Sequence, residues 1–560
     1  MTTRSTSTTV TKSQFVFNLM LAVILAIGLL LAQPAKAVQA ADLLNTSFTS
    51  GTDGFTYQDD TFGTSKAAYA SGSRLTTSVC YGGSGGCLNV RLGGIDSTTV
   101  TNMSGGWVYT FNLATAQTGV SLSLRYRLAM PLAYIYDEYS RVQVSMDGTL
   151  YGRGSKNYVD HTGGDGNFAH DTDWLQVSVF FGNLSAGSHT LILGGFSNKK
   201  TSSTKITDVY FDDVVLSTDN PAPVTSSTQT LVNRLNINTY KSGIQTVAAF
   251  GDRCRNSTSC SPYTSFNYSQ NWLEQQLQAM GYTTYRHSYT YSGWTGSNLY
   301  ATKIGTVYPN QMYMVTNMLD GRGGGGAADD DASGVSLTLE VARALAAADV
   351  QTDYSVRFIF FDQEEIGLYG SKAYVADRRT LQGTAGEPTW LGLIQHDMIL
   401  YDHGVGSNSS TQSPYADLDV EWRDGTTYAT QSKALAQKWR FVNGQYATTY
   451  PANSANNSTN TDDTPFQPYT AAISVRENRR GLTGEWINPY YHQSTDIYNN
   501  YSEADFALGF NALQTTLGLV ADLAGAHIVS ANTAPVANAQ SASTNEDSAK
   551  AITLSGSDAD

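Results

Sequence analysis

Carboxylates gather at two places in the middle of the chain, each beside residues that belong in a core. Three consecutive aspartates at residues 329–331 follow a glycine tract and precede apolar residues at helical spacing. Glu364 and Glu365 follow a mainly apolar stretch typical of a buried strand, Val356, Phe358, Ile359, Phe360 and Phe361. Carboxylates this crowded repel one another, and a bound cation offsets that repulsion. The sequence therefore predicts a metal site supported by core elements.

The chain of 560 residues is too long for one ordinary domain, so we expect a multidomain protein. Its formal net charge of −14 disfavours nucleic acids and anionic membranes as partners. Only 15% of the residues are charged, while glycine and tyrosine are abundant. This composition is typical of extracellular, β-rich proteins.

Residues 1–37 have the layout of a signal peptide. Two basic residues precede an apolar run at residues 15–32, and a small-x-small sequence follows at residues 35–37. A retained membrane anchor is the alternative for this segment. We expect the leader to be removed and the protein to be secreted and extracellular.

The four cysteines form two close pairs, Cys80 with Cys87 and Cys254 with Cys260. In an exported chain each pair is expected to close a small disulfide loop. Neither pair has a second pair or a histidine cluster nearby, which disfavours a metal site at the cysteines.

Residues 41–218 are predicted to form an all-β sandwich. Apolar and polar side chains alternate at residues 120–128, 142–146 and 175–179, and clusters of small polar residues separate these runs. Residues 206–216 resemble the closing strand of jelly-roll modules attached to secreted enzymes. That resemblance implies an accessory domain for a carbohydrate or cell-surface ligand, with calcium as a candidate structural ion. A spacer or folding aid is the alternative.

A linker is expected at residues 219–229, where two prolines stiffen the chain. Helical and strand patterns then alternate over residues 230–527, which predicts an α/β domain. Residues 531–560 resemble the start of a cadherin-like repeat. Such a repeat needs more residues than remain, so we expect the sequence to be a fragment of a longer chain.

The predicted α/β domain at residues 230–527 resembles the M28 family of zinc aminopeptidases, which includes secreted bacterial leucyl aminopeptidases. Residues 328–334 (ADDDASG) and 364–371 (EEIGLYGS) match the two most specific motifs of that family. Looser matches lie at residues 298–301, 395–398 and 488–492. The resemblance implies a mixed central sheet with helices on both faces, and hydrolysis of N-terminal residues from peptides or proteins.

The resemblance also implies the zinc ligands. The family uses two zinc ions bridged by one aspartate, which falls on Asp330 here. Glu365 and His492 take the other positions of the first zinc, and Asp397 takes a position of the second. Glu364 takes the position of the general base, a carboxylate held off the metal that accepts a proton from the attacking water.

Four more aspartates are expected to support these ligands. Asp320 is retained from the first motif of the family, and Asp496 is expected to orient the ring of His492. Asp329 and Asp331 are expected to cap the following helix or to support the metal ligands.

The chain departs from the family where a histidine binds the second zinc, because this position holds Met318. A thioether is a poor zinc ligand beside carboxylates. A one-residue bulge would instead present Asn317, which is also a weak ligand. Three protein ligands and an open position for water make a complete catalytic zinc site. We therefore expect one tightly held zinc and a second zinc that is weak or absent.

Three functional hypotheses follow. The motifs favour a secreted zinc aminopeptidase. A glutaminyl-cyclase-like acyltransferase is an alternative, because those enzymes resemble this fold and use one zinc with a comparable Asp, Glu and His. The third hypothesis is a catalytically impaired adhesion or binding protein, which the intact Glu364 and Glu365 disfavour.

Overall fold

The computed structural model describes most of the chain between residues 42 and 557. The gaps in this description lie at residues 64–66, 131–133, 136, 154–155, 164–168, 219–225, 255–263, 403–417, 448–449, 451, 457, 478–487, 530–535, 539–540 and 554. The predicted leader, residues 1–37, lies outside the described residues. Among the described residues, no helix is both long and apolar enough to cross a membrane.

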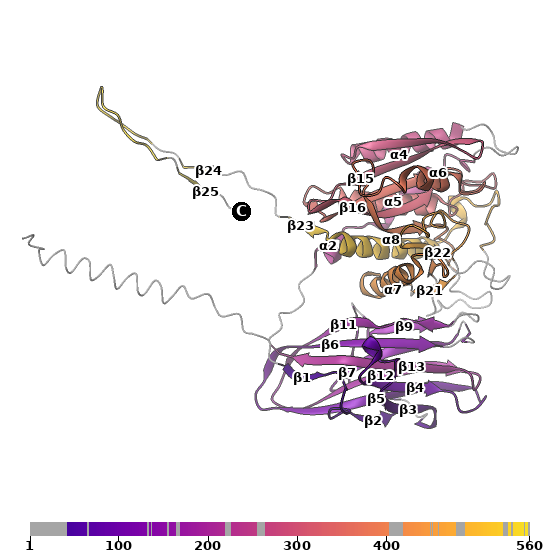
Figure 1. The fold of residues 1–560 in the computed structure, drawn as a ribbon, viewed down its shortest axis with the longest axis vertical. Coiled ribbons are helices and arrows are strands. Elements are labelled where there is room, and N and C mark those ends of the chain that lie inside the picture. Colours follow the sequence, from indigo (N-terminus) through magenta and orange to yellow (C-terminus); the bar gives the residue numbers. More distant parts are fainter. Residues whose placement is uncertain are drawn as a thin grey trace, which may run out of the picture.

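Residues 42–217, here called the β region, contain two antiparallel sheets (Figure 1). The strands are β1 (Asp42–Thr46), β2 (Thr56–Asp59), β3 (Ala70–Leu75), β4 (Cys87–Gly93), β5 (Val100–Leu113), β6 (Gln117–Met130), β7 (Tyr139–Met146), β8 (Thr149–Tyr151), β9 (Asp160–Gly163), β10 (His170–Asp171), β11 (Leu175–Leu184), β12 (Gly187–Lys200) and β13 (Ile206–Ser217), with short 3₁₀ helices η1 (Ala67–Tyr69) and η2 (Tyr81–Gly83).

One sheet of the β region has the order β10-β6-β13-β4-β3, with β1 on β13 and β11 on β6. The other has the order β2-β5-β12-β7-β8, with β9 on β7. Apolar side chains of both sheets form one core, in which Leu124 of β6 and Val144 of β7 are completely buried. Alternation along β6 puts its apolar residues into this core and its polar residues outside it, as the sequence predicts.

The cysteine pair of the β region is joined as expected. Cys80 and Cys87 form a disulfide whose Cα atoms are 5.4 Å apart. Cys260 lies outside the described residues, so the pairing of Cys254 with Cys260 stays a prediction.

Residues 226–528, here called the α/β region, contain seven helices and a large sheet among the described residues. The helices are α2 (Ser227–Asn233), α3 (Ile237–Ala248), α4 (Thr264–Ala279), α5 (Ala332–Leu345), α6 (Tyr369–Arg378), α7 (Ala429–Tyr446) and α8 (Glu503–Ala524), with a 3₁₀ helix η3 (Tyr498–Asn500). The strands are β14 (Thr284–Tyr291), β15 (Trp294–Lys303), β16 (Tyr308–Met318), β17 (Val350–Gln351), β18 (Tyr354–Phe361), β19 (Thr389–His396), β20 (Leu418–Trp422), β21 (Ala452–Asn456), β22 (Ala472–Glu477) and β23 (His527–Ile528).

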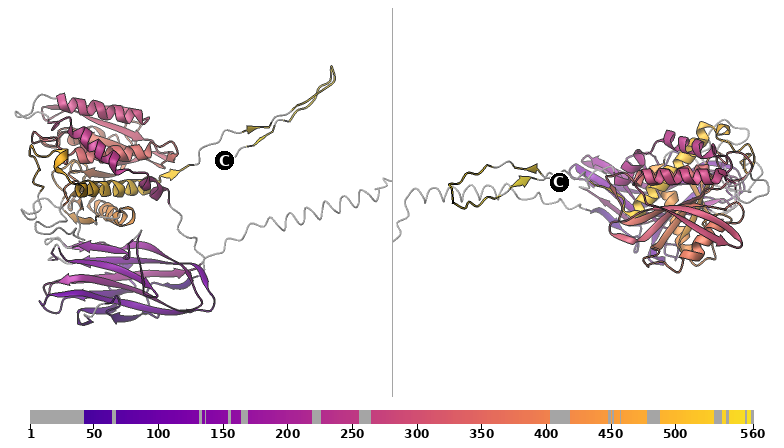
Figure 2. Two further views of the ribbon diagram at one scale, coloured as in Figure 1. Left: turned by 180° about the vertical axis from the view of Figure 1, so that it is seen from behind. Right: turned by 90° about the horizontal axis from the view of Figure 1, so that it is seen from above.

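The predicted linker at residues 219–229 extends too far. Ser226 caps α2, because its side chain accepts a hydrogen bond from the backbone N–H of Gln229. The helix therefore begins at Ser227, inside the segment that the prolines had suggested to be a linker. Beyond the α/β region, β24 (Val536–Ala537) and β25 (Gly556–Ser557) pair with each other, apart from the other sheets (Figure 2).

The central sheet is mixed, with the order β14-β15-β18-β16-β19-β22-β20-β21. Strands β18, β16, β19 and β22 are parallel to one another. Along β18, Phe358 and Phe360 face a core shared with α5 and α8, whereas Ile359 and Phe361 face a core shared with α6. Helices therefore cover both faces, which explains why this strand is apolar without alternation.

The β region packs against the α/β region through α7 and β21 (Figure 1). Arg440 of α7 contacts Asp160 of β9 at 2.8 Å between Nη2 and Oδ2, and Arg153 contacts the other oxygen at 3.0 Å. All three side chains are buried. Arg440 also donates to the carbonyl of His161 at 2.9 Å. A buried ion pair across the boundary fixes how the two regions meet.

Acidification should weaken this contact. Burial alone would raise the pKa of Asp160, but the charges of Arg440 and Arg153 outweigh it and lower the pKa to about 2. An unfolded aspartate titrates near 3.9, so Asp160 contributes about 2–3 kcal/mol of stability above pH ~4, which is lost as the pH falls towards ~2. Chemical unfolding at several pH values should show this loss in the native chain and not in Asp160→Asn.

The matched control is Asp173→Asn, since Asp173 pairs with Lys433 of α7 at 3.0 Å but is half exposed. It should keep the native pH dependence. Equal pH dependence in the native chain and Asp160→Asn would contradict the role of Asp160.

Candidate metal site

The candidate site lies where parallel strands of the central sheet end. Asp320 follows β16, Glu364 and Glu365 follow β18, and Asp397 follows β19. Asp330 immediately precedes the N-cap of α5. Carboxyl ends of parallel strands meet at one edge of a sheet, so segments distant in sequence deliver their side chains to one place.

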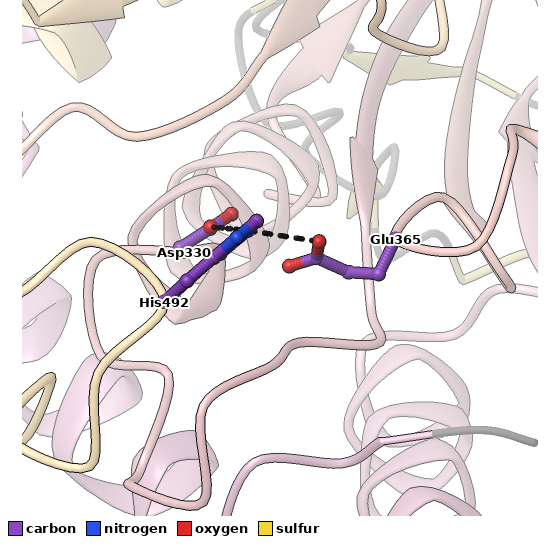
Figure 3. Close-up of side chains that lie close together, drawn as sticks. All are labelled: Asp330, Glu365 and His492. Atoms are coloured by element: carbon purple, nitrogen blue, oxygen red, sulfur yellow. Dashed lines mark ion pairs between the residues drawn. The ribbon is translucent and has the colours of Figure 1, made fainter. Parts of the chain in front are cut away.

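Three side chains converge at this edge, Asp330, Glu365 and His492 (Figure 3). Nε2 of His492 lies 3.1 Å from Oδ2 of Asp330 and 3.0 Å from Oε2 of Glu365. One ligand atom from each residue lies within 4.8 Å of the others. This is the trio that the sequence predicts for the first zinc, and it is assembled from three separate segments.

The chemistry of the trio suits a cation. Asp330 is 2% exposed, and neither of its carboxylate oxygens accepts a hydrogen bond within the described residues. Oε1 of Glu365 has no hydrogen-bond partner in the same part of the structure. Buried carboxylate oxygens without donors are costly unless a positive charge compensates them. Two carboxylates and an imidazole are ligands that zinc prefers.

Glu364 and Glu365 are positioned through their backbone. Asp320 accepts hydrogen bonds from the N–H of Glu364 at 3.1 Å and of Glu365 at 3.3 Å. Burial and the charge of Glu365 raise the pKa of Glu364, and burial and the charge of Asp330 raise the pKa of Glu365. Burial and the charge of Asp362 raise the pKa of Asp320 to about 7. Through its two hydrogen bonds Asp320 holds the backbone that carries Glu364 and Glu365.

A cavity of about 340 Å³ opens beside the trio. Four carboxylates line it, those of Asp330, Glu364, Glu365 and Asp397, together with Met318, Arg322, Leu368, Lys372 and Tyr491. Lys372 donates to the carbonyl oxygen of Gly367 at 2.8 Å. The cavity combines polar groups for chemistry with a few apolar side chains, as a binding site for a small part of a substrate does.

The part of the chain that carries this site is similar to known peptidases. Residues 298–513 match the profile of peptidase family M28. The chain contains an M28 peptidase domain. Leupeptin-inactivating enzyme 1 of Streptomyces exfoliatus is 27% identical over 274 residues, which cover 43% of this chain and 60% of that enzyme.

A probable zinc metalloprotease of Pyrenophora teres f. teres (strain 0-1) is 27% identical over 200 residues, which cover 32% of this chain and 40% of that protein. The chain thus spans less than two thirds of the length of both curated relatives. Among solved structures, the LapA aminopeptidase of Legionella pneumophila has a TM-score of 0.43 at 17% identity, covering 55% of this chain and 78% of that chain.

The second metal position of the M28 domain differs from the first. β16 pairs with β18 without a bulge at Met318, so Met318 lines the cavity and Asn317 does not. The bulge that would present Asn317 is therefore absent from the pairing of these two strands. Asp397 lines the cavity but does not belong to the converging trio, and its Oδ2 lies 3.5 Å from Nη2 of Arg476. The structure does not assemble a second set of metal ligands among the described residues.

The prediction that Asp496 orients the ring of His492 is wrong. Asp496 accepts hydrogen bonds from the backbone N–H groups of residues 328–330 at 3.0, 2.9 and 3.2 Å. The hydroxyl of Tyr501 donates to the same carboxylate at 2.9 Å. The prediction relied on the position of Asp496 four residues after His492. The carboxylate instead faces the loop that carries Asp330.

The outer aspartates of the triplet act as the sequence predicts. Asp331 caps α5 by accepting a hydrogen bond from the N–H of Gly334 at 2.9 Å. Asp329 accepts from the N–H of Leu400 at 2.9 Å and from Nδ2 of Asn488 at 2.7 Å. The peptide bond between Asp330 and Asp331 is cis. Asp330 alone of the three is left to face the other two members of the trio.

Sequence reasoning missed Arg253, which is completely buried behind the site. Its guanidinium donates to carbonyl oxygens of the loop that leads to the aspartates, those of Leu319, Gly326 and Ala327, at 2.8 to 3.0 Å. These contacts hold both ends of the glycine tract. No motif surrounds Arg253, so only the structure reveals its role.

Loss of the Asp496 carboxylate should loosen the loop that carries Asp330. An amide at this position offers one acceptor oxygen where the carboxylate offers two. We expect Asp496→Asn to weaken zinc binding by about 10- to 100-fold, the usual cost of removing a group that orients a ligand. Competition with a chromophoric chelator measures the affinity.

Asp349→Asn is the control, because Asp349 pairs with Arg234 at 2.6 Å on the surface of the same region. Its zinc affinity should equal that of the native chain. Native affinity in Asp496→Asn would rule out a role of the loop hydrogen bonds in metal binding.

Proposed function

We propose that this chain is a secreted zinc aminopeptidase, which hydrolyses N-terminal residues from peptides and proteins. The observation that carries the proposal is the convergence of Asp330, Glu365 and His492 next to Glu364, in one acidic cavity of an M28 domain. The predicted leader at residues 1–37 supports export. The relatives whose names describe a metalloprotease and a leupeptin-inactivating enzyme support peptide substrates.

The trio would hold the zinc ion. Zinc bound there would polarise the scissile carbonyl and increase the acidity of a water molecule. Asp330 and Glu365 contribute two negative charges, and His492 contributes a neutral nitrogen donor. The backbone contacts of Asp320 and Asp496 keep the two carboxylates in position.

Glu364 is the general base of this proposal. It lines the same cavity as the trio but is not one of its members. Burial and the neighbouring charge of Glu365 raise its pKa, which makes it a stronger base than an exposed glutamate. Glu364 takes the proton from the attacking water and delivers it to the leaving amine.

Two carboxylates of the cavity support an amino terminus as the recognised end of the substrate. Glu364 and Asp397 line the cavity and are not assigned to the zinc ion, and either can pair with an N-terminal ammonium group. Arg322 and Lys372 line the same cavity, so this support comes from the position of the two carboxylates and not from the net charge of the cavity.

The proposed enzyme binds one zinc ion tightly per chain. Met318 replaces a nitrogen donor at the second position, and a thioether binds zinc poorly beside oxygen ligands. Metal analysis after dialysis should therefore give one tight zinc equivalent per chain. Two tight equivalents would contradict the assignment.

The function is tested with Glu364→Gln. The amide keeps the size of the side chain but cannot accept a proton, so we expect hydrolysis of an N-terminal leucine substrate to fall by about 10²–10⁴-fold. Zinc content should stay at the native level. The control is Glu503→Gln, because Glu503 is 81% exposed at the start of α8 and should not affect activity.

A parallel assay with an N-terminal glutamine peptide separates the alternatives. Release of the free N-terminal residue supports the aminopeptidase, whereas formation of a pyroglutamyl peptide without hydrolysis would show an acyltransferase. Zinc binding without either product would support the hypothesis of a catalytically impaired binding protein. Unchanged activity in Glu364→Gln would remove Glu364 from the mechanism.

A further inference from the structure

Arg476 lies beside the second metal position, near the end of β22. Its Nη2 is 3.5 Å from Oδ2 of Asp397, and its Nε is 3.7 Å from Oε2 of Glu421. The side chain is 6% exposed, and those of Asp397 and Glu421 are 1% and 2% exposed. A guanidinium group is thus buried between two carboxylates, one of which lines the catalytic cavity.

Further contacts fix the orientation of Arg476. It donates to the carbonyl oxygen of Thr459 at 3.2 Å and to the hydroxyl of Ser474 at 3.3 Å. Asp463 is a third buried carboxylate within reach of its charge: burial raises the pKa of Asp463 to about 6, and the charge of Arg476 opposes that rise. Arg476 therefore supplies permanent positive charge to an acidic part of the core.

This charge bears directly on a second metal ion. A guanidinium group does not lose its proton in proteins, so its repulsion of a divalent cation near Asp397 persists at every accessible pH. Met318 adds a second obstacle, because it lines the same cavity as Asp397 and its thioether is a poor zinc ligand. Charge and ligand chemistry at this position therefore oppose a metal ion for separate reasons.

We propose that Arg476 replaces the second metal ion, holding Asp397 at the cavity wall and excluding a divalent cation from it. The proposal rests on the proposed aminopeptidase function in one respect, since it assigns Asp397 to the substrate. Asp397, freed from a metal, meets the N-terminal ammonium group of the peptide as a carboxylate. Arg476 is a positioning residue, because it acts through Asp397 and does not line the cavity.

The test introduces a histidine ligand at position 318, once with Arg476 present and once with its positive charge removed. In Met318→His, the guanidinium group of Arg476 still repels a divalent cation near Asp397, so we expect one tight zinc equivalent, as in the native chain. In Met318→His/Arg476→Gln, the charge is gone and we expect two. Met318→His/Arg476→Lys is the matched control, since it keeps the charge and should bind one equivalent. Calorimetric titration of the metal-free chains with zinc gives the number of sites without reference to activity.

Two results would overturn the proposal. One is a second tight zinc in Met318→His, which would show that the methionine alone excludes the metal. The other is a single equivalent in folded Met318→His/Arg476→Gln. If that variant does not fold, the added change Glu421→Gln removes the carboxylate left without its cation, and the triple variant is titrated in its place.

The substrate part of the proposal has its own readout. Asp397→Asn should raise the KM for a peptide with a free amino terminus by about 10-fold or more, with a smaller effect on kcat, because it removes an ion pair to the bound ammonium group. An unchanged KM would reject this role. Absence of any hydrolysis by the native chain would instead reject the proposed function, and the zinc titrations would still decide the role of Arg476.

Discussion

Repulsion between buried carboxylates is the constraint that the α/β region must satisfy at its catalytic edge. Isolated charges in a protein interior are expensive, and aspartates and glutamates from four segments meet here. Hydrogen-bond donors that point at the carboxylates offset this cost. Backbone N–H groups point at Asp496 and Asp320, and a metal ion would compensate the trio. The loop, the strands and the helix cap are therefore organised by electrostatics as much as by apolar packing.

The two buried arginines address the same constraint in different ways. Arg253 donates to backbone carbonyls on both sides of the glycine tract, so it acts mainly on the shape of the loop. Arg476 lies directly between carboxylates and acts on their charge. Arg253 thus holds the loop that carries Asp330, whereas Arg476, in the proposal above, limits the number of cations that bind.

The sequence predicts those parts of the molecule that depend on local patterns. Alternation along β6 and the apolar run at residues 358–361 of β18 each indicate the right type of strand. A strand buried on one face alternates apolar and polar residues, whereas a strand buried on both faces does not. The family resemblance of the two acidic motifs and of residues 488–492 implied that Asp330, Glu365 and His492 converge. Capping by Asp331 follows from its position one residue before a helix.

Roles that depend on distant contacts could not be predicted in this way. Asp496 is four residues from His492 in sequence, yet its hydrogen bonds reach residues 328–330 on another segment. Arg253 and Arg476 lie in stretches without a motif. Their guanidinium groups contact oxygen atoms that are distant in sequence, so their roles leave no pattern in the residues next to them. The start of α2 was missed because the prolines before it masked the cap at Ser226.

The ion pair between Asp160 and Arg440 has a consequence for how such a protein can be rebuilt. Arg440 belongs to α7, which also packs on α8 and on strands β20, β21 and β22, so the α/β region carries this charge to the boundary. A chimera that exchanged residues 42–217 for an unrelated module would leave the charge without Asp160. A domain that replaces the β region must therefore provide a carboxylate that can pair with Arg440.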